Sequence, residues 1–251
     1  MKYLTYTLLL VAALLMAAPV FGQDAKEIIR KAEAKRRGIE SSYSEMTMTI
    51  VRPTWKRETT MKSWSKGTEY ALILITGPAS QKGLATLKRG REVWNWVPQW
   101  QSTKKLPPSM MSQSWMDSDF TNEDLVQNIS IIDDYDHQVL GEETVEGRKC
   151  WKIELIPHDD VPVVWSKVYS WVDQKDYLTL RSEFFDEDDF MVNIMKASNI
   201  KVMGGKVVAS KLTMIPVEDE GHETIMEYNK LVFDQKIPES QFTIQMLKRI
   251  R

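Results

Sequence analysis

The sequence predicts a mainly β fold: an antiparallel meander of about ten strands behind one N-terminal helix, with two short helices across one face of the sheet. Three observations lead to this fold class. From Tyr43 onward apolar and polar residues alternate with a period of two, as in a strand with one apolar face. Turn pairs such as Lys66-Gly67 and Arg89-Gly90 follow at short spacing. Between Leu106 and Gln127 the alternation stops.

Composition places the chain among ordinary folded proteins. It has 251 residues, of which 43% are hydrophobic, and 33 basic residues stand against 35 acidic ones. A formal net charge of -2 gives no field that attracts a polyanion, so nucleic acid is not expected as a partner. Cys150 is the single cysteine, which excludes an intrachain disulfide. The 14 methionines and 9 tryptophans predict a large, soft and aromatic interior or surface.

The first residues have the pattern of an export signal. Lys2 is followed by an apolar run from Leu8 to Ala18, and Val20 and Gly22 are small residues that suit signal peptidase. The alternative, an uncleaved membrane anchor, needs about 20 apolar residues, and this run is shorter. The sequence therefore predicts a cleaved signal peptide at residues 1–22 and a single mature domain at residues 23–251.

The mature chain begins with an amphipathic helix. Apolar residues recur at helical spacing from Asp24 to Ile39, with Asp24 placed as N-cap and Gly38 as the stop. Its basic face allows two interpretations, contact with a membrane surface or exposure to solvent while the apolar face covers a sheet. Acidic residues dilute the basic face, and the second interpretation is favoured.

The segment from Leu106 to Gln127 interrupts the strands and is too apolar for a plain surface loop. Pro107 can open one short helix, and Thr121 with Asp124 resembles a capping box that starts a second. Two interpretations of its large apolar side chains remain open. They fill an ordinary core, or they form an adaptable contact surface, since the flexible thioether of methionine repacks around varied shapes.

Several stretches resemble a known family. Glu92–Trp96 leads to Pro98, a basic Lys104-Lys105 pair follows, and then comes MMSQSWMDSDFTNEDL. Within it, Ser-Trp-Met-Asp-Ser-Asp-Phe-Thr is similar to the Ser-Phe-Met-Gly-Ser-Asp-Phe-Thr run of the outer-membrane lipoprotein-sorting proteins, relatives of the LolA and LolB carriers. Trp115 stands in place of Phe and Asp117 in place of Gly. The hairpin from Val145 to Trp151 fits the same family.

The resemblance implies a half-open antiparallel β-barrel whose helices form a lid over an apolar cavity for acyl chains. It implies a periplasmic carrier that binds lipid or acylated lipoprotein and transfers it between membranes, with an inner-membrane exporter as a candidate partner. The alternative function is a non-catalytic accessory protein that docks on a membrane exporter and has a solid core.

The predicted lipid-binding residues come from the strands and from the lid. On the strands they are Met46, Met48, Ile50, Leu72, Leu74, Trp94 and Trp96, and in the lid they are Met110, Met111, Trp115, Met116 and Phe120. The strand containing Leu72 and Leu74 is apolar on both faces. A helix therefore covers one of its faces and a cavity lies along the other, with the sides not assigned.

No catalytic or metal-binding pattern is present in the sequence. His137, His158 and His222 lack partners at a ligand spacing, and there is no Gly-x-Ser-x-Gly motif. The acidic runs, such as Asp186–Asp189, lie at turns, where they are solvated or dock a basic partner. We expect no enzyme activity, no cofactor and no metal.

The export signal gives the first testable prediction. N-terminal sequencing of the exported protein should start close to Gln23, because the small residues that end the apolar run suit signal peptidase. Recovery of an intact Met1 in the membrane fraction would contradict cleavage.

Overall fold

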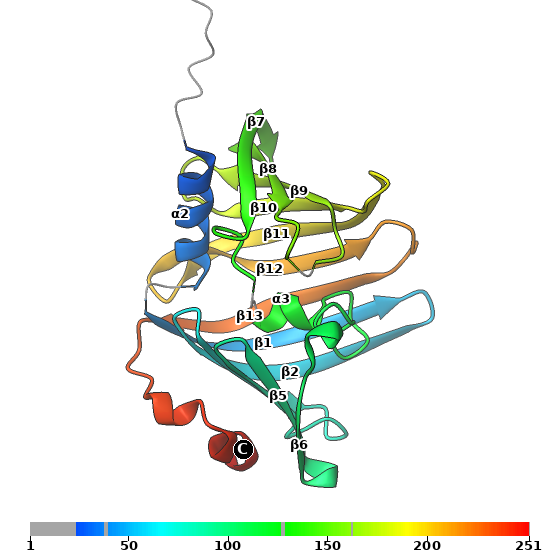
Figure 1. The fold of residues 1–251 in the computed structure, drawn as a ribbon, viewed down its shortest axis with the longest axis vertical. Helices are drawn as coiled ribbons and strands as arrows, with labels where there is room; N and C mark the ends of the chain where they lie inside the picture. The colour runs from blue at the N-terminus through cyan, green and yellow to red at the C-terminus, as the bar shows by residue number, and fades with distance from the viewer. Residues whose placement is uncertain (1–23, 38–39, 127–128, 162, 251) are drawn as a thin grey trace, which may run out of the picture.

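The computed structural model describes residues 24–37, 40–126, 129–161 and 163–250. The predicted signal peptide lies outside this part of the chain. The described strands form one antiparallel sheet that curves around α2 and a small helix, α3 (Figure 1). The half-open, mainly β fold predicted from the sequence is confirmed. No described helix is long and apolar enough to span a bilayer.

The sheet is an almost continuous meander with β1 and β13 at its centre and β6 and β7 at its edges. The strands are β1 (Ser41–Arg52), β2 (Trp55–Lys66), β3 (Tyr70–Gly77), β4 (Ala85–Arg89), β5 (Glu92–Val97), β6 (Ser102–Lys105), β7 (Tyr135–Val145), β8 (Arg148–Pro157), β9 (Lys167–Asp173), β10 (Thr179–Phe185), β11 (Met191–Met203), β12 (Lys206–Pro216) and β13 (Glu223–Phe233). The helices are α2 (Ala25–Arg37), η1 (Pro98–Trp100), η2 (Pro108–Met110), α3 (Asn122–Val126), η3 (Glu239–Gln241) and α4 (Ile244–Arg249).

The described part of the chain contains thirteen strands, where the sequence predicted about ten. Turns of only two residues, such as Pro53-Thr54 and Gly204-Gly205, join some consecutive strands. Both glycines of the second turn have positive φ, as a tight hairpin turn requires. A Cβ atom on Gly204 would lie 2.8 Å from the Leu231 carbonyl oxygen, so the turn accepts no side chain there.

The chain crosses from one edge of the sheet to the other between β6 and β7. Residues 106–126 of this connection, here called the lid segment, lie over the sheet face that α2 also covers (Figure 1). We call this the inner face; its buried residues include Met48, Ile50 and Ile73, which share one hydrophobic cluster with Ile29 of α2 and Phe120 of the lid segment.

Helix α2 follows the sequence prediction where it is described. The Asp24 side chain accepts a hydrogen bond from the Lys26 backbone N–H at 3.0 Å, which caps the helix. Ile28 and Ile29 are buried against the inner face. The helix therefore covers the sheet with its apolar side, as the favoured interpretation stated, while the predicted stop at Gly38 lies outside the described residues.

The opposite, outer face carries a second apolar cluster. Leu72 and Leu74 pack there against Phe242 and Leu247 from the C-terminal segment, and all four are at most 1% exposed. The ring of Tyr70 stacks on Phe242 with centroids 5.3 Å apart. The C-terminal segment therefore seals this face of β3.

Phe242 should hold this seal. Replacing it with Ala should lower the free energy of unfolding by about 3–5 kcal/mol, because a fully buried aromatic ring leaves a cavity. The control Ile244→Ala, at a position 40% exposed in the same segment, should change it by less than about 0.5 kcal/mol. Urea denaturation measures both, and equal effects would contradict a structural role for this segment.

Candidate functional site

The lid segment packs its aromatic residues against the inner face. Trp115 and Phe120 are 6% and 5% exposed and join the hydrophobic cluster of α2 and the central strands. The backbone N–H of Trp115 donates to the Phe120 carbonyl oxygen at 2.8 Å, which closes a small hairpin-like loop. The apolar side of the lid segment therefore covers part of the inner face, as a second sheet does in a β-sandwich.

The predicted capping box opens α3. The backbone N–H of Thr121 donates to the Asp124 carboxylate at 2.7 Å, and the Asp124 N–H donates to the Thr121 hydroxyl at 3.1 Å. The first predicted short helix is the 3-10 turn η2, which begins just after Pro107. Both short helices of the lid are thus present, each only a single turn or slightly more.

A buried ion pair fastens the lid segment to the sheet. Arg52, at the end of β1, donates to both Asp119 carboxylate oxygens, at 2.9 and 3.0 Å. The two side chains are 11% and 10% exposed. The Thr224 hydroxyl on β13 donates to the same carboxylate at 2.6 Å and accepts from the Asp119 N–H at 3.0 Å. We call these three residues the latch.

Arg57 of β2 holds the turn beside the latch. Its guanidinium donates to the Met116 carbonyl oxygen and, at 3.3 Å, to the Asp117 carboxylate. Met116 and Asp117 have φ values of 54° and 61°, a left-handed conformation that costs most residues energy and that Asp tolerates better than most. Contacts from the sheet thus stabilise a strained turn in the lid.

Two small cavities remain between the lid and the inner face. One of about 100 Å³ is lined by Ile73, Ile75, Trp115 and Met116, among others. The other, of about 150 Å³, lies toward α3 and is lined in part by Met46 and Phe120. Both are smaller than the 300–1,000 Å³ of typical small-molecule sites, so the closed lid leaves little room for a ligand.

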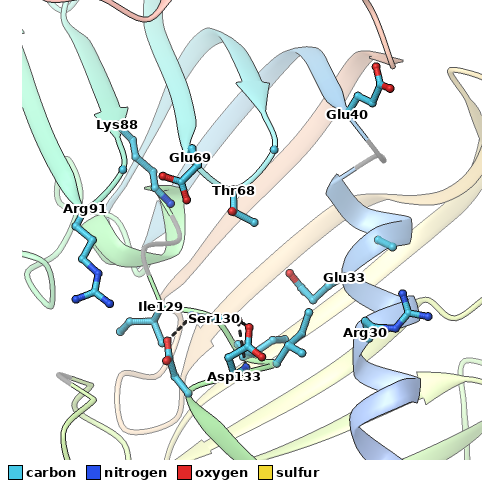
Figure 2. Close-up of a pocket in the computed structure, with 16 residues that line it drawn as sticks. Arg30, Glu33, Glu40, Thr68, Glu69, Lys88, Arg91, Ile129, Ser130 and Asp133 are labelled. Atoms are coloured by element: carbon cyan, nitrogen blue, oxygen red, sulfur yellow. Dashed lines mark hydrogen bonds between the residues drawn. The ribbon is translucent and has the colours of Figure 1, made fainter. Parts of the chain in front are cut away.

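A larger polar cleft of about 580 Å³ opens beside the second cavity (Figure 2). Its walls come from the end of α2, the β2–β3 turn, the β4–β5 turn and residues 129–134. Gly67, Thr68 and Lys88 line both spaces, so the cleft and the inner cavity adjoin. The polar cleft therefore lies next to the inner cavity at this end of the inner face.

Charged groups meet at the boundary between α2 and α3. Arg36 lines the inner cavity and donates to both carboxylate oxygens of Glu33, at 2.6 and 3.1 Å. Burial opposes the charge on Arg36, but Glu33 outweighs it and the pKa of the guanidinium is raised. Burial raises the pKa of Asp124 and that of Tyr228, and nearby Arg36 partly opposes both shifts. The inner cavity thus has a polar wall beside an apolar one.

The chain was compared with known protein families, sequences and structures. A family model described as "Uncharacterized protein" matches residues 67–249. No curated protein sequence matches the chain significantly. A solved DUF1329 family protein from Desulfovibrio piger is 25% identical, with a TM-score of 0.81 over 89% of this chain and 97% of its own.

Two further structures are similar. A putative outer membrane lipoprotein-sorting protein domain from Vibrio parahaemolyticus has a TM-score of 0.80 at 23% identity, over 90% of this chain and 98% of its own. A LolA superfamily protein from Nitrosomonas europaea has a TM-score of 0.75 at 23% identity, over 89% and 99%. The chain belongs to the matched family and has the LolA-superfamily fold.

The LolA-like fold divides the twelve predicted lipid-binding residues between two faces of the sheet. Met46, Met48 and Ile50 lie on the inner face, together with Trp115 and Phe120 and, partly buried, Met116. On the outer face, Leu72 and Leu74 belong to the cluster of the C-terminal segment, and Trp94 and Trp96 pack against it. Trp96 also lines the cavity of about 100 Å³ beside Trp115 and Met116. In the lid, Met111 packs against Val93, Leu106 and Val126, and Met110 is 39% exposed.

The inner-face residues of β3 are Ile73 and Ile75, which the sequence prediction passed over. The apolar run of β3 contains no signal that separates them from Leu72 and Leu74. The register of the folded sheet does so: Met46 pairs with Met61, and Ile73 pairs with Ser63 two positions further along β2 on the same face. The latch residues Arg52 and Thr224 were also missed. An ion pair between β1 and a distant loop leaves no periodic pattern in a sequence.

The structure shows the surroundings of His137 and Cys150, two residues considered as catalytic or metal-binding candidates. His137 contacts the Ile131 carbonyl oxygen at 2.7 Å, and burial lowers its pKa. Cys150 is buried, and burial is the main reason why the pKa of its thiol rises to about 11. The thiol is therefore a poor nucleophile. Among the described residues, no three His, Cys, Asp or Glu side chains are grouped so that they could hold a metal.

The latch should contribute more than a surface ion pair. A double-mutant cycle with Arg52→Ala and Asp119→Ala should give a coupling free energy of about 2 kcal/mol, because both charges are buried and bidentate. The exposed pair Lys56–Glu58, 3.8 Å apart, is the control and should give less than about 1 kcal/mol. Equal couplings in urea denaturation would show that the latch does not fasten the lid.

Proposed function

We propose that this LolA-fold protein is a non-catalytic carrier that binds lipid, or the acyl chains of a lipoprotein, on its inner face and transfers it between membranes. One observation carries the proposal. An apolar sheet face is covered by a helix and by a lid segment with little regular structure, and a polar latch at one point fastens the lid. A cover of this kind can leave and be replaced by acyl chains.

The energetics support replacement of the lid by cargo. Each buried methylene of an acyl chain contributes about 0.8 kcal/mol, which offsets apolar contacts that the lid loses when it moves. The cavities under the closed lid, about 100 and 150 Å³, are too small for such a chain. Binding therefore requires the lid to move outward while the sheet keeps its shape.

The similar structures support this role in general terms, since one relative is described as a putative lipoprotein-sorting domain and another as a LolA superfamily protein. With the predicted export signal, the carrier acts in the periplasm after cleavage near Gln23. Its ligand is lipid or an acylated lipoprotein, and an inner-membrane exporter is the proposed donor.

A second candidate function, docking on such an exporter without carrying cargo, has its own observation. Three loops at the latch end of the sheet each expose one large apolar residue: Val164 at 58%, Phe190 at 66% and Val217 at 42%. Acidic runs flank them, for example Asp186–Asp189 and Glu218–Glu220. Such a surface suits a basic protein partner.

Native mass spectrometry of the purified mature protein separates the two functions. The carrier function requires a co-purifying lipid, or stoichiometric uptake of phospholipid from vesicles. A protein that stays free of lipid after incubation with vesicles would contradict the carrier and leave docking as the function.

The lid residues test the same proposal by mutation. In the Met111→Ser, Met116→Ser double variant, bound lipid per folded molecule should fall sharply while the melting temperature falls only modestly. The reason is that Met111 packs within a small cluster at the sheet edge and Met116 is only partly buried. Gln113→Ser, at an exposed position in the same segment and outside the predicted lipid-binding set, is the matched control. A large loss of melting temperature with unchanged lipid content would show that the lid is ordinary core.

A further inference from the structure

The inner face changes character along its strands. Toward the latch, β1 and β2 present Met48, Ile50 and the paired Met46 and Met61. Toward the other end, the same face presents serines in register: Ser44 pairs with Ser63, and Ser42 pairs with Ser65. The Ser42 and Ser65 hydroxyls are 2.7 Å apart, and all four serines line the inner cavity.

The serine end leads directly into the polar cleft. Lys88 of β4 is 4% exposed and lines both the inner cavity and the cleft. Figure 2 shows Lys88, Thr68 and Glu69 on one side of the cleft, opposite Glu33 and Arg30 of α2. Polarity thus rises in steps from the methionines through the serines to the charged groups of the cleft.

Both signs of charge line the cleft. Its cations are Arg30, Lys88 and Arg91, and its carboxylates are Glu33, Glu40, Glu69, Asp133 and Asp134. Some of these charges already have partners outside the cleft: Glu33 pairs with Arg36, Arg30 with Glu27 and Asp133 with Lys26. A purely anionic group would meet more carboxylates than cations in the cleft. A group with both an anion and a cation finds partners for each.

We infer that the cargo is a zwitterionic phospholipid, held with its headgroup in this cleft and its chains running past the serines toward Met48 and Ile50. The inference rests on the proposed carrier function and names its ligand. The phosphate lies near Lys88 and Arg91, and the ammonium lies near Glu69. A cleft of about 580 Å³ has the size of a small-molecule site.

A competition experiment tests the headgroup. The full mature protein is incubated with vesicles that contain equal amounts of phosphatidylethanolamine, phosphatidylglycerol and diacylglycerol, and the lipid it removes is measured by mass spectrometry. Phosphatidylethanolamine should be enriched over each of the others by about tenfold, the effect of one charge-assisted hydrogen bond. Arg91→Gln should reduce the enrichment over diacylglycerol, which lacks the phosphate. The control Arg89→Gln, on the outer face of the same turn, should not.

Photo-crosslinking tests the orientation. Phosphatidylethanolamine with a diazirine on the headgroup should label residues 67–69, 88–91 or 129–134, and a diazirine at the chain end should label β1 near Met48 or the lid near Met116. Reversed labelling overturns the orientation, and equal uptake of all three lipids overturns the zwitterionic headgroup; in both cases the carrier function stands. No uptake of any lipid overturns the carrier function and this inference with it.

Discussion

One constraint shapes the rest of the molecule: a long curved sheet presents an apolar inner face that no second sheet covers. Exposing that face to water would cost about 25 cal/mol for each Å² of apolar surface. Helix α2 covers it near β7 and β9, and the lid segment covers it near the centre. The outer face over β3 is sealed differently, by Phe242 and Leu247 of the C-terminal segment. The C-terminal segment covers its face with fully buried side chains, whereas the lid segment covers the inner face with short helices and turns.

Polar contacts with β1 and β13 fasten the lid segment to the sheet. Its methionine side chains are flexible and can pack in more than one way. The latch joins Asp119 to Arg52 of β1 and Thr224 of β13. These two strands are neighbours in the centre of the sheet. In the proposed function the lid opens by breaking this ion pair, and water at the end of the sheet then solvates the separated charges. At the other end of the inner face, serines and the cleft beyond them provide a polar environment. In the proposed function, a closed lid and an amphiphile are alternative occupants of one surface.

Much of this architecture could be predicted from the sequence, because it rests on local patterns. Period-two alternation gave the strands, Asp24 gave the helix start, and the Thr121 and Asp124 pair gave the second lid helix. The family motif around Asp119 pointed to the LolA-like fold. The turn at Asp117 is kept even though the resemblance has Gly there, since Asp adopts the left-handed conformation.

What could not be predicted depends on contacts between distant segments. An apolar run such as Leu72 to Ile75 is buried on both faces, so its pattern does not tell which residues face the cavity. Register with β2 and packing of the C-terminal segment decide it, and the predicted site therefore mixed Leu72 and Leu74 with residues of the inner face. The cleft likewise forms only when four separate segments converge.

Hydrogen–deuterium exchange of the lid, with and without bound phosphatidylethanolamine, tests the central claim most directly. In the closed state the N–H groups of Trp115 and Asn122 are bonded to carbonyl oxygens within the lid segment. The account predicts that lipid loading accelerates exchange in residues 106–126 and leaves β1 and β13 unchanged. Stoichiometric lipid binding with unchanged protection of the lid segment would contradict the claim that cargo takes the place of the lid.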